Sequence, residues 1–373
     1  MGFDHNSVFW NQTVLQFSAG SPAVLHAVLS VSALHEDLLE GRSITSTSSG
    51  EMLFLKQYNK AIQHLRSSQD FQAVSATLIC CILFVCLENF RGNHDTALAH
   101  LQSGLKILQD WRTKEIESTS EIDVRESITR VFRRLDMQAT AFMDSRQPHI
   151  NATSVDEYAP ESSNSASSYF KSLQQAQDEF ERIAIRLFYV LTLKSHPKYS
   201  PTRTTLLRGL AIRFNAWKKS FDTFSDRESP SMDTRDLQLS VMLGLHFQAA
   251  TLMLDLRANP VVFENEIDLK CVRIINLSRS LINSSNLSKP KFSSDMGVIG
   301  PLYFAAMNAS PSIRQQAIDL LYRIKGKEGF WDPRTTAKIA KEVLIIQQHV
   351  KSPGLPVTGG VQFLAAAHRI PCN

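Results

Sequence analysis

The sequence predicts an all-α protein, a large multi-helical domain of packed antiparallel helices with no significant sheet. Nearly every apolar segment of the 373 residues repeats with apolar positions three and four apart. No run alternates apolar and polar residues between hairpin turns, and no strand–helix–strand rhythm occurs. With 43% hydrophobic residues, the chain can bury a large core, as one big helical domain or as two merged ones.

The first half of the sequence contains five helical segments. The first begins at Ser21-Pro22, because proline fits the first turn of a helix. Residues 41–50 are a flexible loop by composition. Residues 74–88 are apolar almost all round, which predicts a central buried helix. The apolar stripes of the other four segments are Val24, Val28, Val31, Leu34 and Leu38; Leu55, Tyr58, Ile62 and Leu65; Ala97, Leu101, Leu105 and Leu108; and Ile128, Phe132, Leu135, Ala139 and Phe142.

The second half repeats this pattern after a polar segment. Residues 148–168 are rich in Asn, Ser and Ala, and we interpret them as an internal linker, disordered or looping over the surface. Connections are predicted at 195–203, 225–233 and 283–295 from their Ser, Pro, Asp and Asn content. The helical stripes of this half are Leu173, Ala176, Phe180, Ile183, Leu187 and Val190; Leu207, Leu210, Phe214, Trp217 and Phe221; and Leu239, Leu243, Phe247, Ala250 and Leu254.

The most distinctive stretch is residues 297–332, the signature segment. In it, Pro301 stops one element and favours the start of the next. Ser310 and Pro311 then form an N-cap and first-turn pair, which starts an amphipathic helix. The apolar stripe of that helix is Ile313, Ala317, Leu320 and Ile324.

The signature segment also contains a residue pattern in three pieces. They are Pro301, Leu302, Tyr303, Phe304 and Ala306; Ile313, Arg314, Ala317, Ile318, Leu320 and Leu321; and Glu328, Gly329, Trp331 and Asp332. Further pieces in matching order are Phe9, Trp10, His26, Ala27, Leu29, Ala33, Leu34 and His35; Tyr58, Ala61 and Ile62; the apolar run from Cys80 to Glu88; Ala97, His100, Leu101, Gly104, Leu105, Ile107 and Leu108; and Phe132, Leu135, Asp136, Gln138 and Phe142.

Together these pieces resemble the regulatory (middle homology) domain of fungal zinc-binuclear-cluster transcription factors, also known as the fungal-specific transcription factor domain. The resemblance implies a nuclear regulatory domain, of a kind commonly tied to control of metabolic or secondary-metabolite gene clusters. We expect this domain to span residues 1–350. The Pro- and Gly-rich residues after Gln348 end the fold, which makes residues 351–373 a C-terminal tail.

The cysteines depart from the family's pattern. The DNA-reading module of such factors needs six cysteines in two short clusters, whereas this sequence has five in all, and none precedes Cys80. Cys80 and Cys81 are adjacent in a predicted helix, so their side chains point about 100° apart and cannot chelate zinc together. We interpret Cys80, Cys81 and Cys86 as small buried hydrophobes. The sequence therefore predicts that the zinc module is absent. The alternative is that the chain is a fragment of a full-length DNA-binding regulator whose module is missing from the gene model.

The sequence also does not match the motifs of the enzyme classes that we considered. His35-Glu36 is not followed by the second histidine of a zincin, because Leu39 stands at that position. No Gly-x-Ser-x-Gly elbow, phosphate-binding glycine loop or Asp-Asp-x-x-Asp cluster occurs. Glu264, Glu266 and Asp268 lie near a helix start, where carboxylates favour the helix dipole, and we prefer this interpretation to a metal site. We name no catalytic, cofactor-binding or metal-binding residue and expect no enzyme and no cofactor; a pathway accessory protein or an enzyme of unknown chemistry is the alternative.

The remaining candidates have structural interpretations. His26 is a packed side chain, not a base, and His64, His94 and His100 have no partner that the sequence identifies. Trp10, Trp111, Trp217 and Trp331 are predicted to anchor helix junctions. Acidic residues interrupt a basic group near the end of the sequence, so we interpret this group as a solvated helix face and not as a phosphate or nucleic-acid contact. Its members are Arg323, Lys325, Lys327, Arg334, Lys338 and Lys341.

The function predicted from these observations is regulation of transcription without a DNA-binding module in the chain. The protein would pair with a DNA-binding relative, bridge to the transcription machinery or hold a small-molecule effector between helices. No secretory signal is visible, and the longest apolar run, Leu78 to Leu87, is about half of the roughly 20 residues that a membrane span needs. The net charge of +4 is mild and does not predict nucleic-acid binding, because a basic footprint needs clustering as well as sign. We therefore expect a soluble protein of the nucleus, and possibly also of the cytoplasm, that contacts no membrane.

Overall fold

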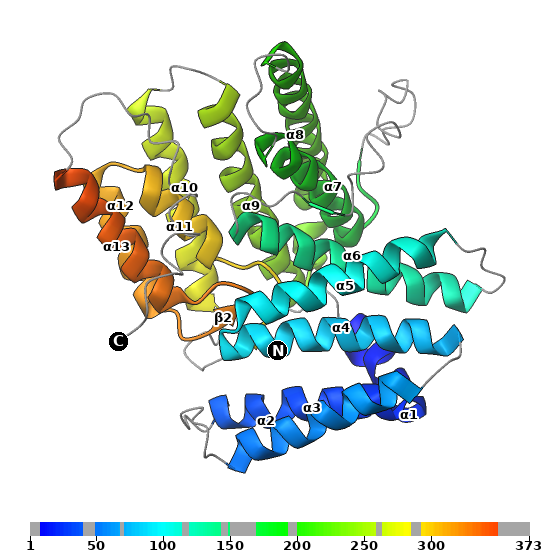
Figure 1. Cartoon of the computed structure of the whole chain (residues 1–373). Coiled ribbons are helices and arrows are strands. Elements are labelled where there is room, and N and C mark those ends of the chain that lie inside the picture. Colours follow the sequence, from blue (N-terminus) through cyan, green and yellow to red (C-terminus); the bar gives the residue numbers. More distant parts are fainter. Residues whose placement is uncertain are drawn as a thin grey trace. The chain divides into compact units, whose positions relative to one another are not determined.

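The computed structural model describes residues 8–39, 49–67, 71–113, 119–142, 148–149, 169–192, 200–258, 263–284 and 292–349 (Figure 1). Nearly all of these residues are helical, so the predicted all-α class is confirmed. The strands within these ranges are two residues long each: β1 (Phe292–Ser293) pairs in parallel with β2 (Lys327–Glu328). The chain divides into two compact units, each built from three segments of sequence.

Unit 1 consists of residues 1–139, 289–296 and 326–330. The elements that it contains are the π-helical turn η1 (Phe9–Thr13), α1 (Val14–Gly20), α2 (Pro22–Leu39), α3 (Ser49–Ser67), α4 (Phe71–Arg91), α5 (His94–Arg112), most of α6 (Thr119–Phe142), β1 and β2. Helix α2 packs against α1, α3 and α4, and α4 packs against α5. The predicted helix start at Pro22 is observed, and the other predicted stripes of this half lie on helices, but α3 begins inside the loop that we expected at 41–50.

Helix α4 forms the centre of unit 1. Every residue from Leu78 to Phe90 is buried, which confirms the predicted central helix. The stretch Val74–Arg91 has a mean hydropathy of 1.7, and α9 (Thr234–Ala258) reaches 1.4, so both are long and apolar enough to cross a membrane by length and composition. Of the Val74–Arg91 stretch, 83% is already buried inside the protein. A core helix of a water-soluble fold has the same properties.

Unit 2 consists of residues 140–288, 297–325 and 331–373. Its described elements are α7 (Leu173–Thr192), α8 (Ser200–Glu228), the 3₁₀ turn η4 (Ser229–Ser231), α9, α10 (Glu264–Ser284), α11 (Ile299–Asn308), α12 (Pro311–Arg323) and α13 (Pro333–His349). Helices α7, α8 and α9 pack together, α10 packs on α9, and α11 to α13 pack on one another. Trp217 lies where α7, α8 and α9 meet: its Nε1–H donates to the Ala176 carbonyl at 2.8 Å, and its ring stacks on Phe221 and Phe247.

All four tryptophans are buried, as predicted for anchors of helix junctions. In unit 2, Trp331 packs edge-on against Phe142, with ring centroids 5.3 Å apart, and contacts Tyr303 at 5.8 Å. Two pieces of the signature segment thus meet at this indole, because Tyr303 lies on α11 and Trp331 just precedes α13. The large apolar area of tryptophan makes it suited to fill such a junction.

Several predicted connections in unit 2 are wrong in their bounds. Helix α8 begins at Ser200, inside the predicted loop at 195–203, because Pro201 is tolerated in a first helical turn. It then continues through 225–228 into η4, so the predicted connection at 225–233 shrinks to residues 232 and 233. Pro301 does not end an element; it lies in the first turn of α11. Most of the predicted linker at 148–168 and the whole tail at 351–373 lie outside the described residues.

Candidate functional site

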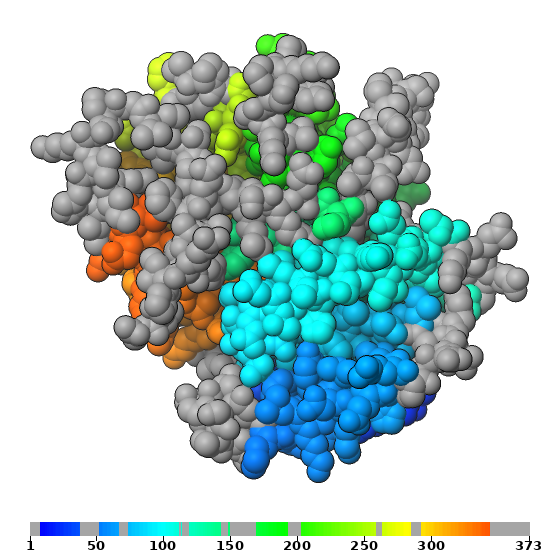
Figure 2. All heavy atoms as spheres, in the orientation of Figure 1, coloured from blue at the N-terminus to red at the C-terminus, as the bar shows by residue number. Residues whose placement is uncertain are grey.

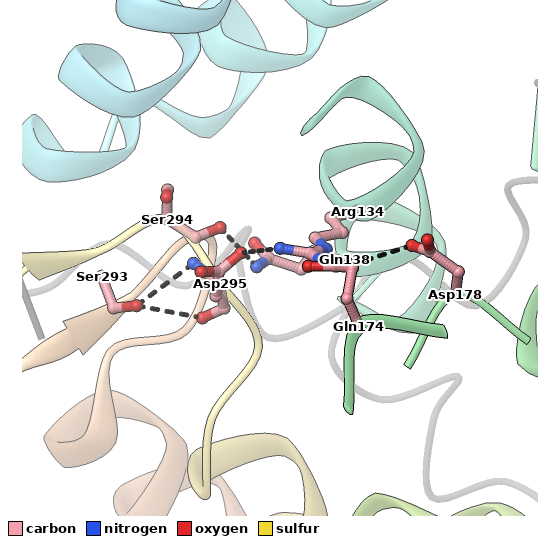
Figure 3. A network of polar contacts seen from close by, with 7 residues as sticks. All are labelled: Arg134, Gln138, Gln174, Asp178, Ser293, Ser294 and Asp295. Atoms are coloured by element: carbon pink, nitrogen blue, oxygen red, sulfur yellow. Dashed lines mark hydrogen bonds and ion pairs between the residues drawn. The ribbon is translucent and has the colours of Figure 1, made fainter. Parts of the chain in front are cut away.

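A buried polar network in unit 1 involves α6 and the two short strands (Figure 3). Arg134 and Gln138 are one turn apart on α6, and both side chains point toward residues 293–295. The Arg134 guanidinium lies 3.6 Å from the Asp295 carboxylate, and both groups are about 95% buried. Gln138 Nε2 donates to the Ser294 carbonyl at 2.6 Å. Removing water from two buried charges offsets much of their attraction, so this ion pair is by itself weak evidence for stability.

Gly329 completes this network. Its N–H donates to the Ser293 carbonyl at 2.7 Å, next to the β1–β2 pair. Its φ of +52° is a backbone conformation that favours glycine. A Cβ atom at this position would lie 1.9 Å from Gln138 Oε1, so the glutamine oxygen occupies the space that any other side chain needs. Two residues of the family pattern, Gln138 and Gly329, therefore touch each other, and their role here is to hold the backbone.

A second cluster of polar groups lies between α3, α4 and α5 of unit 1. A hydrogen bond of 2.9 Å joins Tyr58 Oη to His100 Nε2. Glu88, only 3% exposed, accepts a hydrogen bond of 2.8 Å from Asn93 Nδ2, and its carboxylate lies 3.4 Å from the Arg91 guanidinium. The Phe84 ring packs against both Tyr58 and His100. The cluster thus surrounds a buried carboxylate with donors.

Burial sets the protonation of this cluster. It lowers the pKa of His100, although the nearby Glu88 carboxylate opposes that shift. It raises the pKa of Tyr58, and Glu88 raises it further. At neutral pH the cluster therefore holds a neutral imidazole and a neutral phenol. It offers hydrogen bonds, but no activated nucleophile.

The structure identifies partners for the histidines whose partners the sequence could not identify. The His26 ring stacks on His64 with centroids 5.4 Å apart, and His26 Nδ1 lies 2.6 Å from Gln57 Oε1. His94 Nδ1 lies 3.2 Å from Asn89 Oδ1, while His100 bonds Tyr58 as described above. His26 is therefore a packed side chain, as interpreted from the sequence.

The four described cysteines are buried and form no disulfide with one another. Burial raises the pKa of Cys81 to about 12, and that of Cys271 also to about 12, with Asp268 adding to the second shift. A thiol that stays protonated at neutral pH is neither a good nucleophile nor a zinc ligand. Within the described ranges, no group of three or more His, Cys, Asp or Glu side chains is placed to hold a metal ion.

The acidic group near residue 264 lies close to two helix N-termini. Glu264 and Glu266 lie in the first turn of α10. Asp268 Oδ1 accepts the Ser310 N–H at 2.8 Å, at the start of α12. Ser310 occupies the predicted N-cap position, but its own side chain makes no capping bond. The Asp268 carboxylate from α10 therefore serves the N-terminus of α12, and the structural interpretation of this group holds.

The basic group lies mostly on the surface, as predicted. Its exposed members are Arg323, Lys325, Arg334, Lys338 and Lys341. Lys327 differs: it is half-buried, and its Nζ donates to the Phe90 carbonyl at 3.3 Å within unit 1.

Comparisons with known proteins identify the class of protein that this helical fold represents. The sequence pattern of the fungal specific transcription factor domain matches residues 1–343. The chain therefore belongs to the family of proteins with a fungal specific transcription factor domain, as the residue pattern indicated.

Two curated relatives are transcription regulators. The chain is 33% identical over 110 residues to the transcription regulator lscL of Purpureocillium lilacinum, which covers 27% of this chain and 26% of that protein. It is 27% identical over 137 residues to the aspercryptin biosynthesis cluster-specific transcription regulator atnN of Emericella nidulans, which covers 36% of this chain and 22% of that protein. The matches span about a quarter of each relative's length. No solved structure matches the chain.

Proposed function

We propose that this chain regulates transcription of a fungal metabolic or secondary-metabolite gene cluster through contacts with other proteins. The observation that supports this most is the family match over residues 1–343, which covers both helical units. The similarity to atnN, named as a biosynthesis cluster-specific regulator, favours a secondary-metabolite cluster as the target. The regulation would take place in the nucleus, which a fluorescent fusion examined by microscopy tests directly.

We further propose that these 373 residues do not read DNA sequence themselves. Binuclear zinc clusters need six thiolate ligands, and the sequence has five cysteines. Four of these are buried in helices, and burial keeps them protonated in every case where their pKa shifts. The chain would reach promoters by pairing with a DNA-binding regulator or with the transcription machinery.

A DNA-binding assay separates this proposal from its alternative. The purified chain is titrated against promoter fragments of a candidate gene cluster and against a scrambled fragment of equal length. We expect weak, salt-sensitive binding with equal affinity for both, since only a general electrostatic attraction remains. A tight gel shift that selects one promoter fragment would overturn the proposal.

Two further experiments address the cellular role and the fragment hypothesis. Deletion of the gene should change transcripts and products of one metabolic cluster, and affinity purification should recover a DNA-binding regulator. Unchanged transcripts and metabolites would contradict a regulatory role. An in-frame six-cysteine cluster in the genomic sequence upstream would instead identify the chain as part of a DNA-binding regulator.

We also propose that the protein is not an enzyme. The support is chemical: burial raises the pKa of Cys80, Cys81 and Cys271, and the Tyr58–His100 pair holds two neutral groups. The raised pKa values of the thiols and of the Tyr58 phenol keep these groups protonated at neutral pH, which opposes nucleophilic catalysis by them.

A further inference from the structure

Ser229 lies in a short exposed connection of unit 2, between α8 and α9. It is the first residue of the 3₁₀ turn η4, and Pro230 follows it. Ser229, Pro230 and Ser231 are all exposed. Figure 2 shows part of α8, in green, at the surface of the molecule. A serine directly before a proline is the pair that proline-directed protein kinases recognise, since the proline ring presents a fixed φ and no N–H.

The structure distinguishes this pair from the other Ser-Pro pairs whose side chains it describes, Ser21-Pro22 and Ser310-Pro311. Both of these serines are half-buried, and the proline after each of them begins a helix, of 18 residues in α2 and of 13 in α12. The N–H of each serine is also hydrogen-bonded, at 2.8 Å in both cases. A kinase binds its substrate as an extended segment, so phosphorylation of either serine would require the start of a helix to unfold.

The turn at Ser229 holds its conformation less firmly. The Met232 N–H donates to the Ser229 carbonyl at 3.4 Å, which is long for such a bond, and Met232 itself is extended. Ser231 Oγ donates to the Glu228 carbonyl at 2.8 Å, but water replaces such a bond at an exposed position. A residue before proline also prefers extended backbone to the helical region. Opening of this turn therefore costs little and unwinds no long helix.

We propose that Ser229 is phosphorylated by a proline-directed protein kinase. The Ser229 hydroxyl oxygen bonds to the γ-phosphorus of ATP, the bond from that phosphorus to the β,γ-bridging oxygen breaks, and ADP leaves, while the hydroxyl proton passes to a base of the kinase. The product carries about two negative charges at neutral pH. This site goes beyond the proposed function and does not depend on it.

The surroundings of Ser229 make a phosphate disruptive. It would lie at the C-terminal end of α8, where the helix dipole is negative. Asp226, three residues earlier and exposed, places a carboxylate on the same side of the chain. A phosphate beside a carboxylate at a helix C-terminus weakens that end by repulsion. We therefore expect the last turn of α8 to fray on phosphorylation.

That last turn contains Arg227, which connects α8 to the residues before α7. The Arg227 guanidinium donates to the Phe170 carbonyl at 3.1 Å and lies over the Tyr169 ring, 5.4 Å from the ring centroid. Fraying of α8 would move Arg227 and release the Phe170 carbonyl. Phosphorylation of Ser229 would thus control how firmly residues 169–170 are held against α8.

Kinase assays on the full chain test the site. The folded protein is incubated with a purified proline-directed kinase and Mg-ATP, and mass spectrometry measures the rate of phosphorylation at each serine. Each rate is divided by that of a synthetic peptide with the same sequence, so that the ratio reports the fold and not the flanking residues. We expect this ratio to be at least about tenfold higher for Ser229 than for Ser21 and Ser310. Equal ratios would overturn the proposal, and so would a Ser229 that stays unmodified in the chain or in its peptide.

Hydrogen exchange tests the structural consequence. After kinase treatment, the amides of residues 169–173 should exchange faster in the wild type than in the matched control Ser229→Ala. Arg227→Ala should show the same faster exchange without the kinase, because it removes the contact with Phe170 directly. Unchanged circular dichroism shows that both variants are folded. Equal exchange in the treated wild type and in Ser229→Ala would overturn the release through Arg227.

Discussion

Gly329 is held by two independent constraints, its own backbone angle and the side-chain oxygen of Gln138. The structure separates these constraints, because Gly92 has a positive φ of 81° with nothing within 4 Å of its missing Cβ. Gly244, inside α9, has neither constraint. Three glycines thus form a graded series for substitution by alanine.

We predict that Gly329→Ala is the most destabilising member of this series. Gly92→Ala should lower the free energy of unfolding by about 1–2 kcal/mol from the left-handed backbone alone. Gly329→Ala should lower the free energy of unfolding by about 1–3 kcal/mol more than the backbone effect alone, because the new Cβ overpacks against Gln138. Gly244→Ala should raise the free energy of unfolding by up to about 1 kcal/mol. Urea unfolding followed by circular dichroism measures all three. If Gln138→Ala in the same chain gives no partial rescue of Gly329→Ala, the clash is not the cause.

The pKa of His100 predicts a loss of stability in mild acid. Because burial lowers this pKa in the folded state, the unfolded chain binds the proton first, below its ordinary value of about 6.5. Stability should therefore fall as the pH drops through that value toward the folded pKa. The facing groups are Tyr58 on α3 and Glu88 and Arg91 on α4.

The measurement is the melting temperature between about pH 7.5 and pH 5.5. The melting temperature of the wild type should fall by more degrees over this range than the melting temperature of His100→Gln. Burial also lowers the pKa of His35, so the variant should remove only part of the pH dependence. An identical pH profile for wild type and variant would refute the assignment to His100.

At the level of elements, one carboxylate of α10 bonds the backbone at the start of α12. Asp268→Ala leaves the Ser310 N–H without its acceptor at the start of α12 and should lower the free energy of unfolding by about 1–2 kcal/mol. Asp268→Asn keeps an acceptor and should lose less. The control is Glu264→Ala, at an exposed position of the same helix, with an expected change within about 0.5 kcal/mol. A loss for Glu264→Ala as large as that for Asp268→Ala would contradict this account.

The helices could be predicted from local pattern, and so could the starts at Pro22 and Pro311, where a serine precedes a first-turn proline, but several other ends could not. The stripes beginning at Val24, Leu173 and Ile313 all lie on observed helices, because burial of one face selects the helical period. The connection at 225–233 failed, since Ser, Asp and Glu favour loops only weakly, and the helix continues until Pro230 bends the chain. Ser310 shows the same limit: its position as N-cap was predicted, but the carboxylate that bonds its N–H comes from another helix.

The buried polar network around Arg134 and Asp295 could not be predicted from the sequence. Arg134 and Asp295 are far apart in the chain, and no spacing rule joins them. A local signal did exist, because Arg134 and Gln138 share one face of α6 with buried apolar neighbours, where a polar pair needs partners. The same applies to Glu88, a carboxylate that follows an unbroken apolar run in α4.

At the level of the whole molecule, the two apolar helices allow a test of the predicted lack of membrane contact. Because α4 is largely buried inside protein, we predict that the full chain stays in the supernatant after lysis without detergent and ultracentrifugation. An integral membrane protein from the same lysate serves as the pellet control. Release of the chain only by detergent would indicate that α4 or α9 contacts lipid.

The way in which the chain alternates between its two units limits how the protein can be divided. The five residues from 326 to 330 belong to unit 1, although residues on both sides of them belong to unit 2. A cut after residue 288 removes both short strands from unit 1 and α11 to α13 from unit 2. No contiguous fragment contains one unit without part of the other. Recombination that exchanges continuous stretches between genes can therefore transfer this regulatory domain only as a whole.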